Sequence, residues 1–217
     1  KQLSEIFTLC IITFGAIAFI YLVIGSSFGY LALKKPISFL TDSSVGWNSW
    51  VIIIFGNLIR ILLYVFPIFL QGMNKMSIYY NILSFQRIVY ITMALGVLYF
   101  SPSLLNLSIA SALSLIIVSL LFWLVFYLKN KEIKVLKINK DLFYIIWDSA
   151  WKSGMTKIIA PIIQYISGII FAQFASPFAS SSFLLTQRIF DMIIQLSDIT
   201  FNNFLPKIAL LRANNNF

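Results

Sequence analysis

The sequence predicts an all-α integral membrane protein, a polytopic bundle of about six transmembrane helices. Of its 217 residues 60% are hydrophobic and 11% are charged, whereas soluble domains carry about 25% charged residues. Six stretches reach the ~20 residues that a helix needs to cross ~30 Å of hydrocarbon. Membrane barrels would need strands of about 10 residues with alternating polarity, and the sequence has no such pattern. The six stretches are 5–33, 49–70, 77–100, 103–128, 153–175 and 179–205.

The first four stretches form one predicted group, residues 1–128. The first contains a small-xxx-small spacing, Gly25 to Gly29, which lets helices approach closely. We expect it to serve packing within the chain rather than dimerisation. Tryptophans lie near the ends of the stretches, where an interfacial aromatic belt would place them. They are Trp47, Trp50, Trp123, Trp147 and Trp151.

A basic linker, residues 129–152, separates these four stretches from the last two, in 153–217. Its first half is a lysine run, and its second half is predicted to be a helix that lies in the membrane interface. A solvated loop that obeys the positive-inside rule is the alternative. One face of that helix would carry Asp141, Tyr144, Asp148 and Lys152.

The loop charges predict the orientation of the chain. If the six stretches alternate in direction, one side receives only Lys34 and Lys35, and the other side receives ten of the 16 Lys and Arg. The side with ten cations is expected to be cytoplasmic, with both ends of this chain inside. The net charge of +9 therefore reflects topology and does not indicate nucleic acid as a partner. The ten are Lys1, Lys75, Lys129, Lys131, Lys134, Lys137, Lys140, Lys152, Lys207 and Arg212.

The composition argues against familiar enzymes. The chain has no histidine, which removes Ser-His-Asp catalysis, zinc and haem ligation and histidine proton relays. Its single cysteine, Cys10, permits no internal disulfide and no cysteine metal cluster. Neither GxxxxGK nor GxGxxG occurs. We expect no enzyme activity, no catalytic residue, no cofactor and no metal.

Polar residues form stripes on the predicted spans. In the last span five polar residues follow a +3, +4, +3, +4 spacing, which places them on one helical face. The second span repeats this spacing, and the third and fifth spans carry weaker versions. The stripes are Arg188, Asp191, Gln195, Asp198 and Asn202; Asn57, Arg60, Tyr64, Pro67 and Gln71; Tyr80, Ser84 and Arg87; and Ser153, Lys157, Pro161, Gln164 and Gly168.

These stripes predict a shared interior, because a charged group at mid-membrane costs about 3 kcal/mol or more. Four cations against two carboxylates give this interior a net charge of +2, which selects anions. The alternatives are snorkelling for Arg87 and Lys157, a structural pair for Arg188 and Asp191, and ordinary proline kinks. The predicted substrate-pathway residues are Asn57, Arg60, Arg87, Lys157, Gln164 and Arg188, and the candidates for ion coupling are Asp191 and Asp198.

Segments of the chain resemble a known family. They are "WKSG" from Trp151, the serine-rich turn before "FLLTQRIFDMI" from Phe183, "LPKIALLRA" from Leu205, and "FLQGMNKMSIYYNI" from Phe69. Their order resembles helices three to eight of bacterial polysaccharide flippases, the O-antigen and capsule-repeat transporters related to MATE exporters. Since the chain begins at Lys1 and covers six helices, we expect it to be an excerpt of a longer protein.

The resemblance implies a two-lobe, twelve-helix fold in the bacterial inner membrane, moving substrate by alternating access. It also implies export of a lipid-linked oligosaccharide on polyprenyl diphosphate for O-antigen, lipopolysaccharide or capsule synthesis. Expected partners are this substrate, membrane lipids, a proton or sodium counter-ion and polysaccharide assembly proteins. The alternatives are an ion-coupled MATE-type exporter of small cationic molecules, working through Asp191 or Asp198, or a polytopic polysaccharide polymerase or ligase. The latter usually needs a large outer loop, whereas the longest here, about Lys34 to Asn48, is short.

We predict that the linker 129–152 is cytoplasmic. Single cysteines at Asn130 and Ser44, in a Cys10→Ser background, should differ in labelling by an impermeant thiol reagent added outside. Ser44→Cys should react and Asn130→Cys should not. The opposite pattern would invert the topology.

Overall fold

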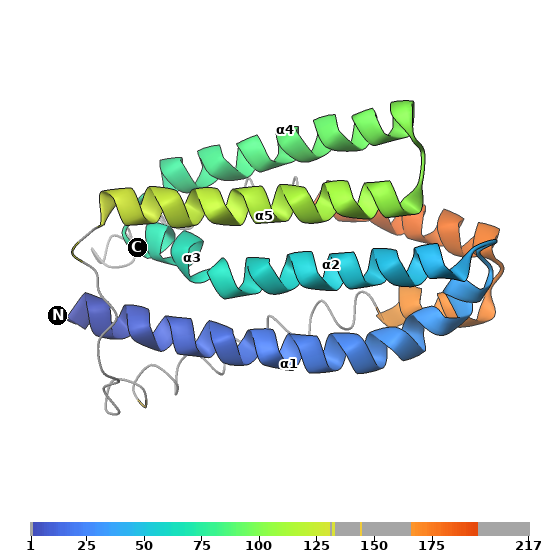
Figure 1. Cartoon of the computed structure of the whole chain (residues 1–217), viewed down its shortest axis with the longest axis horizontal. Coiled ribbons are helices and arrows are strands. Elements are labelled where there is room, and N and C mark those ends of the chain that lie inside the picture. Colours follow the sequence, from blue (N-terminus) through green and yellow to red (C-terminus); the bar gives the residue numbers. More distant parts are fainter. Residues whose placement is uncertain (1, 131, 133–143, 145–165, 195–217) are drawn as a thin grey trace, which may run out of the picture. The chain divides into compact units, whose positions relative to one another are not determined.

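The computed structural model describes residues 2–130, 132, 144 and 166–194 (Figure 1). The chain divides into two compact units, Lys1–Lys157 and Ile158–Phe217. In the described ranges the regular structure is entirely helical, which confirms the all-α class. Four segments are long and apolar enough to cross a membrane, and they correspond to the first four predicted spans. They are Leu3–Ser38, Ser43–Gly72, Met76–Phe100 and Leu104–Lys129.

Five labelled helices build the first unit. They are α1 (Gln2–Ser38), α2 (Ser43–Leu63), α3 (Val65–Gly72), α4 (Met76–Phe100) and α5 (Leu104–Lys129). The expected outer loop from Lys34 to Asn48 is wrong in length, because α1 continues to Ser38 and α2 already begins at Ser43. Asp42 explains the early start, since its Oδ1 accepts a hydrogen bond of 2.9 Å from the Ser44 N–H and caps α2. Hydrogen bonds from Ser44 lower the pKa of the Asp42 carboxyl.

The second predicted span, 49–70, is not one continuous helix. It breaks at Tyr64, and α3 leaves α2 at an angle (Figure 1). Pro67 is the cause, because it has no N–H for the carbonyl of Leu63 and its ring crowds that carbonyl. At the break the Tyr64 N–H donates to the Ile61 carbonyl at 3.2 Å. This carbonyl lies three residues back instead of the usual four, so the turn is tighter than in an α-helix.

Small residues bring the helices together. The most extensive contact between two helices joins α2 and α5, which are distant in sequence and run in the same direction (Figure 1). At its centre a Cβ added to Gly56 would lie 2.9 Å from the Ala112 Cβ, so the two backbones approach closely. Gly25 and Gly29 of α1 face Ile54 and Trp50 of α2. The expected packing within the chain at these two glycines is confirmed.

An aromatic core fills one end of the unit, where α3 packs between α1 and α5. Phe7 stacks on Phe126 with ring centroids 5.3 Å apart, and Phe69 meets Phe7 edge-on at 5.1 Å. Val65 and Leu70 of α3 are almost completely buried, at 1% and 0% exposure. Burial of each such side chain stabilises a packed state by roughly 1.5–3 kcal/mol where water is the alternative, and less where lipid is. Packing in this core therefore fixes α3, the second half of the broken span, in place.

The loops lie at two opposite ends of this unit. The α1–α2 and α4–α5 connections share one end, while the α3–α4 turn and the end of α5 share the other (Figure 1). At the latter end Lys75 Nζ donates to Asn130 Oδ1 at 3.0 Å, across 55 residues of chain. Lys34 and Lys35 thus lie at the end away from Lys75, as alternating spans require. The side of the membrane that each end faces stays a prediction.

The described part of the second unit is helical over 166–174 and 177–194. The predicted serine-rich turn is wrong in detail, because Ser180–Ser182 are already helical and the turn lies at Ala175 and Ser176. Ser176 Oγ accepts from the Ala179 N–H at 3.3 Å and caps the second segment, so the helix begins earlier in the sequence than Ser180. The rings of Phe171 and Phe183 pack 4.9 Å apart across the turn.

We predict that Gly56→Leu destabilises the first unit, because the added side chain must separate α2 from α5. The free energy of unfolding in mixed micelles should fall by about 1–3 kcal/mol. Gly15→Leu is the matched control, since a Cβ at Gly15 meets nothing within 4 Å. Equal stability of the two variants would contradict the close contact at Gly56.

Candidate functional site: a cationic cavity

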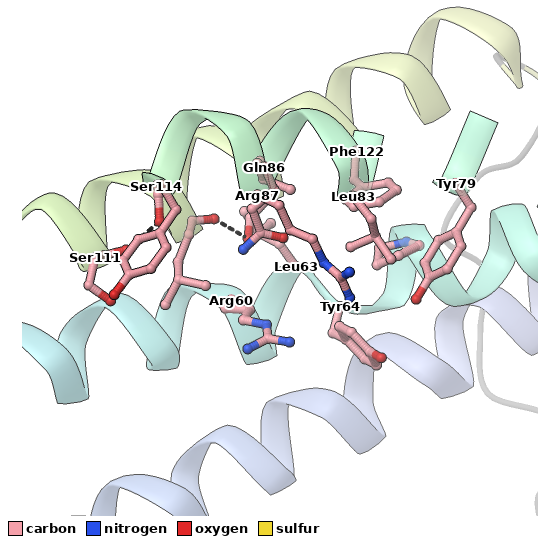
Figure 2. Close-up of a pocket in the computed structure, with 15 residues that line it drawn as sticks. Arg60, Leu63, Tyr64, Tyr79, Leu83, Gln86, Arg87, Ser111, Ser114 and Phe122 are labelled. Carbon is pink, nitrogen blue, oxygen red and sulfur yellow. Dashed lines mark hydrogen bonds between the residues drawn. The ribbon is translucent and has the colours of Figure 1, made fainter. Parts of the chain in front are cut away.

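A cavity of ≈ 420 Å³ lies between the α2–α3 break, α4 and α5 (Figure 2). Its size falls in the range of ligand pockets, about 300–1,000 Å³. The lining residues come from the second span, α4 and α5, and four of them belong to predicted polar stripes: Arg60, Tyr64, Pro67 and Arg87. The lining residues are Arg60, Leu63, Tyr64, Pro67, Tyr79, Leu83, Gln86, Arg87, Tyr90, Ser111, Ser114, Leu115, Val118, Ser119 and Phe122.

The helix break forms one wall of this cavity. Leu63, Tyr64 and Pro67, the residues at and around the break, all line it. α2 is fixed to α5 through Gly56, while α3 turns into the aromatic core. Space therefore remains at the point where the two helix segments diverge. Non-helical backbone inside a membrane protein is tolerated where it lines such a cavity.

Two arginines enter this space from different helices. Figure 2 shows Arg60 on α2 and Arg87 on α4 reaching toward the same region. At 1.5 Å per residue Arg60 lies about 26 Å from Ser43, and Arg87 about 16 Å from Met76. Arg87 is thus near the middle of its span. Arg60 lies in the last turn of α2, where the partial negative charge of the helix end favours a cation.

Hydroxyl groups of α5 form the opposite wall. Ser114 Oγ donates to the Ser111 carbonyl at 2.8 Å (Figure 2). Ser119 Oγ donates to the Leu115 carbonyl, also at 2.8 Å. Each of these hydroxyl oxygens keeps lone pairs that can accept a further hydrogen bond. Tyr64, Tyr79 and Tyr90 add phenol groups and aromatic faces. The wall can therefore hold hydroxyl-bearing ligands.

The charge of the cavity is positive. None of the described lining residues is acidic, so Arg60 and Arg87 give this wall a charge of +2. Guanidinium groups bind carboxylate and phosphate oxygens with paired hydrogen bonds. Both arginines are exposed in the first unit, and fixed positive charge at a hollow favours anions over cations.

The predicted stripes of the second and third spans meet at this cavity only in part: Gln71, Tyr80 and Ser84 are not among its described lining residues, and Tyr80 and Ser84 are exposed. Arg60, Tyr64 and Pro67 line it together with Arg87. Asn57 is not among the described lining residues, and its Nδ2 donates to the Ile53 carbonyl of its own helix at 2.9 Å. Its place on a substrate pathway stays a prediction.

The predicted residues of the second unit are described separately. Arg188 is exposed, whereas Asp191 is buried at 6% exposure. Ile193 and Ile194 are exposed, as expected for the apolar face of that helix. Lys157, Gln164, Gln195, Asp198, Asn202 and Ile199 lie outside the described residues, as does nearly all of the linker 129–152.

Sequence reasoning missed the contribution of α5. Ser111, Leu115, Val118 and Phe122 recur at +4, +3 and +4, with Ser114 and Ser119 beside them. The serines inside this otherwise apolar span could have indicated a polar wall. They were overlooked because the stripes of charged and amide groups on other spans gave a stronger pattern. Gln86, Tyr79 and Tyr90 were also missed on α4.

The described residues contain no group of three or more His, Cys, Asp or Glu able to hold a metal ion. No protein-family model, no curated protein and no solved structure matches the chain.

We predict that the cavity wall is accessible to water and that the opposite face of α5 is not. In a Cys10→Ser background, Ser111→Cys should react rapidly with a small charged thiosulfonate in vesicles permeable to the reagent. Leu113→Cys, two residues away on the exposed apolar face, should react at least about tenfold more slowly, because thiolate forms poorly in hydrocarbon. Similar rates at both positions would argue against a hydrated cavity.

Proposed function

We propose that this chain is part of a membrane transporter that moves a lipid-linked oligosaccharide, carried on polyprenyl diphosphate, across the bacterial inner membrane. The transport would proceed by alternating access to the cationic cavity. The observation that supports this proposal most directly is that Arg60 and Arg87 line the same cavity, and that none of its described lining residues is acidic.

Charge supports an anionic substrate. A diphosphate or an acidic sugar loses hydration when it leaves water, and fixed cations offset that loss. An arginine near mid-span costs free energy in the unliganded protein. A functional role at Arg87 gives a reason for that cost.

The remaining lining supports a glycan. Sugars present many hydroxyl groups and an apolar ring face, and the cavity offers serine and tyrosine hydroxyls beside aromatic rings. Hydroxyls exchange donor and acceptor roles readily, so such a wall tolerates different sugar orientations. This composition suits a carrier of oligosaccharides better than a site for a small apolar compound.

The competing functions receive less support. An exporter of cationic compounds would need a negative cavity, and the described lining is positive. A polymerase or ligase would use a large outer loop, while the described connections 39–42 and 101–103 are short.

Arginine variants test this proposal in the full-length protein. Arg60→Ala and Arg87→Ala should each reduce export about 10- to 100-fold, because a charge-assisted hydrogen bond contributes about 1.5–3 kcal/mol. Arg60→Lys should retain part of the activity, since it keeps the charge and loses the planar fork. Arg188→Ala is expected to impair export as well. Export is measured as lipid-linked glycan that reaches the outer leaflet, normalised to protein in the membrane.

Leu62→Ala, at an exposed apolar position of α2, is the control for nonspecific damage. Full export by well-expressed Arg60→Ala and Arg87→Ala would contradict the proposal. Asp191→Asn addresses coupling separately: loss of dependence on the ion gradient would support an ion site, whereas recovery of export in Arg188→Ala/Asp191→Asn would indicate a structural pair.

A further inference from the structure

A second hollow lies between α4 and α5, at the end of these helices where they are joined by residues 101–103. It is an open groove of ≈ 460 Å³. Glycine and alanine create the space, since a Cβ added to Gly96 would meet nothing within 4 Å. Its apolar lining is Met93, Gly96, Val97, Phe100, Ile109, Ala110 and Leu113.

This groove is separate from the cationic cavity. On α5 the cavity is lined by Ser111, Leu115 and Val118, whereas the groove is lined by Ile109 and Leu113. At 100° per residue Leu113 points about 200° away from Ser111. The two hollows therefore share no lining residue and use different sides of α5, although on α4 their linings follow one another along one face, from Leu83 and Tyr90 to Met93 and Val97.

The groove continues a lipid-facing surface. Exposed apolar residues follow Leu113 along the same face of α5, at spacings of +4, +3 and +4: Ile117, Leu120 and Leu124. They form a charge-free stripe along a span of 26 residues. In a bilayer, hydrocarbon chains cover such a face, because apolar atoms without charges have no reason to face a water-filled interior. The groove lies at the end of that stripe nearest residues 101–103.

Polar groups close the outer end of the groove. Asn106 Nδ2 donates to Ser101 Oγ at 2.9 Å and to the Ser101 carbonyl at 3.4 Å. Both residues line the groove, and they lie where α4 ends and α5 begins. The neighbouring Tyr99 and Phe100 are 84% and 83% exposed, as suits aromatic residues at the headgroup level. The apolar channel thus runs inward from a polar rim.

We infer that this groove binds one acyl chain of a bilayer phospholipid, with the ester region of the lipid at Ser101 and Asn106. The chain lies against Gly96, Val97 and Leu113, and the Ser101 hydroxyl can donate to an ester oxygen. The position at one end of two candidate spans, the apolar body and the polar rim all match this ligand. The site does not depend on the transported substrate.

Gly96→Leu tests the inference, because a Cβ at Gly96 would meet nothing within 4 Å and the larger side chain would occupy the groove. The full chain, reconstituted in nanodiscs of palmitoyl-oleoyl phosphatidylcholine and transferred to mild detergent, should retain a phospholipid in native mass spectra. Gly96→Leu should lose this lipid. Gly15→Leu, the same change at an open position of α1, should keep it. Equal retention in all three proteins, or loss in both variants, would overturn the inference.

A spin label provides a second measurement that does not depend on the Leu variant. A nitroxide at Gly96→Cys, in a Cys10→Ser background, should collide frequently with oxygen, which concentrates in hydrocarbon, and rarely with a polar nickel chelate. Low collision rates with both reagents would show that protein, from another part of this chain or a second copy, covers the groove. A high rate with the nickel chelate would show a water-filled groove. Either result would overturn the assignment to lipid.

Discussion

The close contact of Gly56 with Ala112 is the constraint on which the first unit depends. It holds α2 against α5 at a distance that larger side chains would not permit. Pro67 then prevents the second span from continuing straight, and α3 turns into the aromatic core around Phe7 and Phe126. Because α2 stays against α5 while α3 diverges from it, a space remains at Tyr64. The cavity is therefore a consequence of backbone geometry before any polar side chain enters it.

The polar side chains give that space its chemistry. Arg60 and Arg87 reach it from helices that α5 holds apart, so two like charges share a region without direct pairing to a described acid. Both arginines are exposed in the first unit, so their free-energy cost depends on the membrane around them, because a charge that hydrocarbon covers loses its hydration. An anionic ligand would offset that cost. This difference between the empty and occupied states is what a binding site for anions requires.

Much of the fold follows from local sequence, and the rest depends on contacts that the sequence does not display. Hydropathy gave the four described spans, because length and apolarity alone decide whether a helix can cross a membrane. The stripe spacing anticipated that Arg60 and Arg87 share a cavity. A proline kink was the alternative weighed for Pro67, but the full break at Tyr64 was not predicted, since a proline in a span bends or interrupts it according to what receives the second half, here the core at Phe69 and Leu70.

The α4–α5 pair separates two environments. One face of α5 presents Ser111, Ser114 and Ser119 to the cationic cavity, and the opposite face presents Leu113, Ile117 and Leu120 to the exterior. Serines donate back to carbonyls of their own helix, so they remain compatible with an apolar span while offering acceptors to a ligand. A helix with this division can border water on one side and hydrocarbon on the other. Side-chain periodicity alone decides which residues of α5 face each environment.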